Sequence, residues 1–204
     1  AVTLADGDTG TVITTSHLAG ISFSGYDGID LGNLTLSAGA VSVNSNYSAI
    51  SKGTITGGSQ SLTLVSSTGT ITVSGAASGL NLLNLQDDNI DSTGAVTFDA
   101  NLTAAERVTV GRAYNINFNG ALTDITADTN FLNTGTVNLG NGTGNILLFS
   151  GGLGTTGNPS NPSGLNLGGT VRTAGTQIDL GALNLKIGRA SWRVRVEISV
   201  GAVP

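Results

Sequence analysis

The chain has 204 residues, and only 10% of them are charged, against roughly 25% in an ordinary soluble domain. Its 8 basic and 13 acidic side chains give a formal net charge of −5 and form no basic stripe, so nucleic-acid binding is not expected. The absence of cysteine excludes disulfides, thiolate metal sites and a cysteine nucleophile.

Pairs of apolar residues two positions apart recur along the chain, separated by glycine, serine, asparagine and aspartate. This period of two places both apolar side chains of a pair on one face of a strand. It predicts roughly two dozen strands, most of them of three to five residues. In chain order the pairs include Ile21/Phe23, Ile29/Leu31, Leu34/Leu36, Val41/Val43, Leu62/Leu64, Ile71/Val73, Val96/Phe98, Val108/Val110, Ile116/Phe118, Val137/Leu139, Ile146/Leu148, Leu165/Leu167 and Ile178/Leu180.

Helix signals are almost absent. No window keeps apolar residues at i, i+3, i+4 and i+7 well enough to predict an amphipathic helix. The nearest is Asn101–Val110, where Ala104–Arg107 could form one turn, but threonine and valine dominate its flanks. We therefore expect an all-β chain with a helix content close to nil.

A short phrase of one glycine followed by an alternating strand returns along the chain. It reads Thr68–Val73, Thr93–Phe98 and Thr134–Leu139, with looser copies elsewhere. We interpret the glycine as a tight turn that needs a positive φ, and the strand as the next side of a coil. The copies are unevenly spaced, which indicates coils of unequal length.

Three architectures accommodate many short strands: two packed sheets, a sheet closed on itself, or a solenoid. The first two usually need strands of five or more residues with polar, charged outer faces. Here the strands are shorter and Leu-Asn-Leu recurs at 80–82, 83–85, 165–167 and 183–185. We predict a parallel β-solenoid of about eight coils, each of about 20–25 residues with three strands.

The solenoid is expected to occupy residues 1–186 as a single repeat region. Because the chain contains no methionine, we expect it to be a piece of a longer array. Residues 187–204 differ in composition, with three arginines and the chain's one tryptophan, Trp192. The run Ile187–Ser191 resembles the translated read-through of a sequencing adapter, as found at the ends of metagenomic reading frames. The alternative is a genuine edge strand, because Trp192 to Val200 alternate apolar and polar residues.

Carboxylates and basic residues on one exposed sheet could serve a polysaccharide-cleaving solenoid. Asp99, Arg107, Arg112 and Asp124 lie near one another in the sequence, but no spacing selects them as a set. We therefore interpret them as surface decoration, and no catalytic, cofactor-binding or metal-binding residue is assigned.

Other motifs allow a second, weaker interpretation. The acidic clusters Asp6/Asp8 and Asp87/Asp88/Asp91 could bind calcium, but turn-forming aspartates are favoured. His17 is the one histidine and is interpreted as a solvated side chain rather than a catalytic base. Gly152–Gly157 matches G-x-G-x-x-G, yet the Pro-containing stretch after it cannot begin the helix that a dinucleotide site requires.

Threonine pairs offer a further alternative. Thr54/Thr56 and Thr70/Thr72 are similar to the Thr-x-Thr arrays of ice-binding solenoids. Such arrays need the pair on the same face in nearly every coil, and the chain does not keep them in register. Ice binding is therefore the least favoured function.

The strand phrases, with Tyr114–Gly120 and Phe131–Gly140, resemble the repeat regions of large bacterial surface adhesins. These are the filamentous-haemagglutinin-like and autotransporter-passenger proteins. The resemblance implies a right-handed parallel β-helix that is secreted or held at the cell surface and acts as a stalk or adhesive surface. It implies a glycan or protein receptor on a host or neighbouring cell, contact with flanking coils of the same polypeptide, no cofactor, no enzymatic activity and no membrane insertion by this segment. The alternative is a carbohydrate-active β-helix. The loop Gly151–Gly164 is where we expect a contact surface.

Overall fold

The computed structural model describes residues 15–18, 22–24, 28–37, 39–45, 47–86, 92–181 and 183–185. Every regular element in this part of the chain is a β-strand, β1 to β22, and it contains no helix, as predicted. Accordingly, no helix long and apolar enough to cross a membrane occurs among the described residues. The segment 187–204 and the acidic clusters Asp6/Asp8 and Asp87/Asp88/Asp91 lie outside them, so the predictions made for these residues stay predictions.

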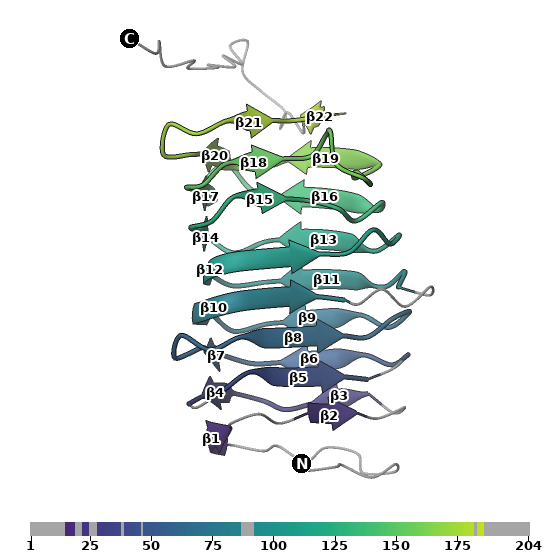
Figure 1. Ribbon diagram of the computed structural model, residues 1–204, viewed down its shortest axis with the longest axis vertical. Coiled ribbons are helices and arrows are strands. Elements are labelled where there is room, and N and C mark those ends of the chain that lie inside the picture. Colours follow the sequence, from purple (N-terminus) through teal and green to yellow (C-terminus); the bar gives the residue numbers. More distant parts are fainter. Residues whose placement is uncertain are drawn as a thin grey trace.

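The strands stack into a parallel β-solenoid of about seven turns with three faces (Figure 1). The first face holds β1 (Thr15–Leu18), β4 (Leu34–Leu36), β7 (Ile55–Thr56), the start of β10 (Ala77–Leu85), the start of β12 (Leu102–Thr109), β14 (Leu122–Ile125), β17 (Ile146–Phe149) and β20 (Thr170–Arg172). The second face holds β2 (Ser22–Ser24), β5 (Val41–Asn44), β8 (Leu62–Val65), the ends of β10 and β12, β15 (Thr129–Asn130), β18 (Leu153–Gly154) and β21 (Ile178–Asp179). The third face holds β3 (Ile29–Asp30), β6 (Ile50–Lys52), β9 (Ile71–Val73), β11 (Ala95–Phe98), β13 (Asn115–Phe118), β16 (Thr136–Leu139), β19 (Gly164–Leu167) and β22 (Leu183–Leu185).

The coil is right-handed, as the resemblance implied. In Figure 1 the chain crosses the near side from left to right along the second face, returns from right to left along the third face behind it, and rises with each turn. We call each turn a rung. Every described strand pair is parallel, and the third face alone stacks eight strands in register. The predicted parallel β-solenoid is therefore confirmed, with about seven turns where about eight coils were expected.

The core is a set of vertical stacks of inward side chains. One stack on the third face joins, rung by rung, Lys52, Val73, Phe98, Phe118, Leu139 and Leu167. Between successive rungs the ring centroids of Phe98 and Phe118 lie 5.8 Å apart, and Phe118 and Phe131 lie 6.1 Å apart. Stacking like residues over like residues buries their apolar area without a second layer of structure, which is why short strands are sufficient.

Two strands point the opposite way from the predicted apolar pairs, and a third buries a threonine. In β12, Arg107 and Thr109 face inward, whereas Val108 is 38% exposed. In β14 the buried residues are Thr123 and Ile125, whereas Leu122 is only half-buried. In β17, Leu147 and Phe149 are buried, and Ile146 is 40% exposed. The run Ile146–Phe149 is apolar at both phases of the alternation, so packing of Phe149 against Phe131, at 6.3 Å, decides its register.

The repeated glycines have a different role from the one predicted. None of Gly69, Gly94 and Gly135 has a positive φ. Instead, each lies against the corner of the preceding rung, where a Cβ would come within 2.2 Å of Ser48 O, 1.6 Å of Gly69 O and 2.2 Å of Tyr114 O, respectively. A side chain cannot fit there, so the glycines allow corners to stack at strand spacing. The expected positive φ was therefore wrong for these three positions, although all three lie at corners as predicted.

Candidate functional site

The four residues considered for polysaccharide chemistry do not converge. Asp99 is exposed after β11, and its Oδ1 accepts a hydrogen bond from Asn119 Nδ2 at 2.9 Å. Asp124 lies on the outer side of the first face in β14, and Arg112 lies at the corner between β12 and β13. Arg107 is inside the coil. The interpretation as surface decoration therefore fails for Arg107, which is only 3% exposed.

Arg107 is held in the core by an aromatic ring and a carbonyl. It occupies the stack that the rungs before it fill with Val41, Leu62 and Leu83. Its guanidinium carbon lies 3.9 Å from the centroid of the Phe131 ring, and its Nη2 donates to Asn130 O at 3.4 Å. A cation over an aromatic face recovers part of the energy lost on leaving water. Burial still lowers the pKa of Arg107 to about 10, which leaves it charged at neutral pH.

Tyr114 caps the same buried region from the corner between β12 and β13. Its hydroxyl donates to Leu85 O at 3.1 Å and accepts from Val110 N at 3.0 Å. Burial raises the pKa of Tyr114 to about 12, so the hydroxyl stays protonated and can donate. These contacts fix the end of β12 and, through Arg107, the strand β15 beside it.

Lys52 is a second buried cation, far from the first. It is 2% exposed, and its Nζ has no hydrogen-bond partner among the described residues. Burial lowers its pKa to about 7, and the nearby charge of Asp30 opposes that shift. Because Lys52 is enclosed in a stack of apolar residues, we assign it no contact with a ligand.

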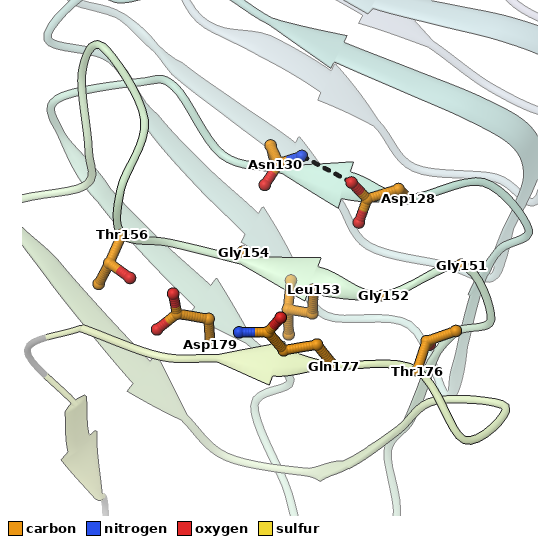
Figure 2. Close-up of a pocket in the computed structure, with 10 residues that line it drawn as sticks. All are labelled: Asp128, Asn130, Gly151, Gly152, Leu153, Gly154, Thr156, Thr176, Gln177 and Asp179. Carbon is orange, nitrogen blue, oxygen red and sulfur yellow. Dashed lines mark hydrogen bonds between the residues drawn. The ribbon is translucent and has the colours of Figure 1, made fainter.

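An open groove on the second face is a candidate binding site. It has a volume of about 410 Å³ and lies over β18, between β15 and β21 (Figure 2). The three strands are in register, with Asn130 opposite Gly154 and Gly154 opposite Asp179. Backbone hydrogen bonds hold them together, from Phe131 N to Gly154 O at 3.0 Å and from Thr155 N to Asp179 O at 2.9 Å.

Glycines make this groove. Leu153 points into the core, so the outward positions of β18 are Gly152 and Gly154, which have no side chain. Asp128 and Asn130 lean over them from β15: a Cβ on Gly152 would lie 2.8 Å from Asp128 Oδ1, and one on Gly154 would lie 2.2 Å from Asn130 Oδ1. The missing side chains leave room for Asp128 and Asn130 to fold over both glycines, which are buried beneath one of the two polar walls.

The walls carry both donors and acceptors. On one side, Asn130 Nδ2 donates to Asp128 Oδ2 at 2.9 Å, which is the contact dashed in Figure 2. On the other side, Gln177 and Asp179 present an amide and a carboxylate (Figure 2). No group of three or more histidine, cysteine, aspartate or glutamate residues in the described part of the chain could hold a metal ion.

Part of the predicted contact loop lines this groove. Gly151–Gly154 and Thr156 belong to it, together with residues of β15 and β21. The G-x-G-x-x-G match therefore has a structural explanation. Its first two glycines, Gly152 and Gly154, lie just before and within β18, and no helix follows them in the described part of the chain. The residues of the two walls could not be predicted from the sequence, because Asp128 and Asp179 belong to the two rungs on either side of β18.

The threonine pairs fall on different faces. Thr54 and Thr56 are at the first face, whereas Thr70 and Thr72 are at the third. The third face instead carries an outward ladder in which Asn117 Nδ2 donates to Thr97 Oγ1 at 3.0 Å, Asn138 Nδ2 to Asn117 Oδ1, and Asn166 Nδ2 to Asn138 Oδ1 at 2.6 Å. We name this row, Thr97, Asn117, Asn138 and Asn166, the amide ladder. Its amides bond along the solenoid axis.

Comparison with known proteins gives no further assignment: the chain matches no family model, no curated protein and no solved structure.

Proposed function

We propose that this chain is a non-enzymatic segment of a large bacterial adhesin, secreted or held at the cell surface. It acts as a rigid stalk and as an adhesive surface, in the manner of filamentous-haemagglutinin-like and autotransporter-passenger proteins. The observation that carries the proposal is the uninterrupted stack of rungs, in which every rung presents polar, mostly uncharged side chains outward around one apolar core.

The stalk role follows from how the rungs are joined. Backbone hydrogen bonds between rungs, such as Ile29 N to Ala49 O and Ile50 N to Thr70 O, both 2.8 Å, run along the solenoid axis. The amide ladder adds side-chain bonds in the same direction. A pull along the axis would load many such bonds at once, so the segment resists extension. It would stack on flanking coils of the same polypeptide in the same way.

The adhesive role is supported by the groove on the second face. It offers hydrogen-bonding groups to a receptor on a host or neighbouring cell, either a glycan or a protein. No cofactor enters the proposal, and neither does insertion of this segment into a membrane.

A carbohydrate-active β-helix is the second candidate, because Asp128 and Asp179 line one groove from opposite sides. Glycosidases use two carboxylates that flank the scissile bond. The two functions differ in whether a bound polysaccharide is cleaved. We expect no new reducing ends when the chain is incubated with a panel of polysaccharides, and cleavage that Asp128→Asn abolishes would favour the enzyme.

Adhesion itself is tested with beads coated with the chain and, separately, with albumin. The coated beads are washed over layers of bacterial and epithelial cells, and retained beads are counted. We expect retention well above the albumin control on at least one cell type. Retention no greater than that of the albumin control on every cell type would reject the adhesive role.

A further inference from the structure

We propose that the groove over β18 binds an uncharged oligosaccharide, and that Asp128, Asn130, Gln177 and Asp179 recognise its hydroxyl groups. This inference rests on the proposed function, since it names the class of receptor that the adhesive surface binds and the residues that bind it. Its first support is size: about 410 Å³ lies within the range of roughly 300–1,000 Å³ that small-ligand sites occupy.

The shape of the groove suits a ring lying flat along a strand. The walls stand on β15 and β21, two strand spacings apart, which is about 9–10 Å between their backbones. Between them Gly152 and Gly154 carry no side chain, and the side chains of Asp128 and Asn130 lie over them. A sugar ring can therefore lie over Asp128 and Asn130 and face Gln177 and Asp179 across the groove. A side chain on β18 would push Asp128 and Asn130 aside. The groove is open to solvent, so a longer chain could extend beyond it.

The chemistry of the walls suits hydroxyl groups. A hydroxyl can donate to a carboxylate and at the same time accept from an amide N–H. Each wall pairs one carboxylate with one amide: Asp128 with Asn130, and Asp179 with Gln177. Hydroxyl donors to carboxylates form the stronger, charge-assisted type of hydrogen bond. A ligand rich in neighbouring hydroxyls can satisfy both walls together.

Charge decides which sugars fit. Two carboxylates line the groove, and neither lysine nor arginine is among its lining residues. A sialylated, sulfated or uronate-containing glycan would place its negative charge against Asp128 and Asp179, at a cost that no nearby cation offsets. A metal ion is a poorer match, because the groove has only two carboxylates and no metal-binding cluster is found in the described part of the chain. Neutral sugars are therefore favoured.

The test is a glycan array that holds neutral oligosaccharides beside their sialylated and sulfated counterparts, probed with the labelled whole chain. The best neutral sugar is then titrated by calorimetry. We expect binding to neutral glycans, little binding to the charged ones, and at least about tenfold weaker binding for Asp179→Asn and for Gln177→Ala. Asp99→Asn is the matched control, because it removes the same charge from an exposed site outside the groove, and it should bind within about twofold of the unchanged chain.

A second variant tests the middle strand. Gly154→Ser adds a side chain where Asn130 Oδ1 now lies, and that flexible amide can move aside without disturbing the backbone. It should also weaken binding at least about tenfold while its circular dichroism spectrum stays that of the unchanged chain. Binding of charged glycans alone, no binding of any array glycan at millimolar concentration, or equal affinity for Asp179→Asn and Asp99→Asn would overturn the proposal.

The two proposals can fail separately. If coated beads adhere to cells but Asp179→Asn adheres equally well, the groove is not the receptor site and the adhesive role stands. If the groove binds neutral sugars but coated beads do not adhere, the ligand assignment stands and the adhesive role falls.

Discussion

The guanidinium of Arg107 lies 3.9 Å from the centre of the Phe131 ring, inside the coil and away from solvent. The contact joins two successive rungs, since Arg107 belongs to β12 and Phe131 directly follows β15. Arg107 also donates to the carbonyl of Asn130, whose side chain forms one wall of the groove. A buried cation thus supports the strand that carries part of the candidate site.

Replacing Phe131 should therefore cost more than replacing another buried aromatic ring of the core. We expect Phe131→Leu to lower the free energy of unfolding by about 1–2 kcal/mol more than Phe98→Leu, because it also removes the cation–π contact. Urea denaturation monitored by far-ultraviolet circular dichroism measures the free energy of unfolding of both variants.

A double-mutant cycle with Arg107→Met isolates this contact. Once the cation is gone, Phe131→Leu should cost about as much as Phe98→Leu. A coupling energy of zero between Arg107 and Phe131 would mean that the ring does not stabilise the buried charge.

Lys52 should make stability depend on pH in the alkaline range. Its pKa is 10.5 in the unfolded chain and about 7 when folded, so between these values the unfolded chain binds one more proton. Stability should therefore rise from pH 7 to pH 10 and be insensitive to this group below pH 7. The full effect is of the order of 4 kcal/mol.

Lys52→Met tests that dependence directly. The variant should be more stable than the unchanged chain at pH 7, and its stability should rise less between pH 7 and pH 10. Arg172→Met, at an exposed position, serves as the control and should leave the pH profile unchanged. Parallel profiles for Lys52→Met and the unchanged chain would contradict the burial of the amine.

The corner glycines should not tolerate even one methyl group. Gly94→Ala would place Cβ 1.6 Å from Gly69 O, a backbone atom that cannot move without shifting a whole rung. We expect a loss of about 3 kcal/mol or more in unfolding free energy, or failure to fold. Gly144→Ala has no atom within 4 Å of its Cβ and should change stability by less than about 1 kcal/mol. Equal effects of the two substitutions would contradict the stacking of the corners.

The amide ladder should contribute measurably to stability. Asn138 donates to Asn117 and accepts from Asn166, so Asn138→Ala removes two side-chain hydrogen bonds. We expect a loss of about 1–2 kcal/mol in unfolding free energy. Asn141→Ala, at an exposed position in a turn, is the matched control and should stay within about 0.5 kcal/mol. A ladder variant as stable as the control would show that the amides add nothing to the stack.

Much of the fold could be predicted from the sequence because local alternation carries the information. Pairs such as Ile71/Val73 and Val96/Phe98 do face the core, since glycine and polar residues on both sides leave them one apolar face. Where the alternation is ambiguous the prediction failed. Arg107 and Thr109 point inward against the apolar pair Val108/Val110, because tertiary contacts with Phe131 and Asn130 outweigh the local pattern.

The candidate site could not be predicted in the same way, because it depends on which rungs are neighbours. Side-chain hydrogen bonds between successive rungs of the third face join residues 20, 21 and 28 positions apart, so no fixed period gives the register. The longest step contains the Pro-containing loop that follows β18. Part of the loop where a contact surface was expected lines the groove, but its partners Asp128 and Asp179 could be assigned only from the stacked structure.

Adhesion that depends on the folded solenoid is the central claim. The most direct measurement compares retention on cells of beads coated with the unchanged chain and beads coated, at equal density, with Gly94→Ala in its unfolded form. The two coatings have nearly the same composition and charge, and differ in whether rungs and groove exist. We predict strong retention for the folded chain and retention near the albumin level for the unfolded variant. Equal retention of both coatings would contradict the account.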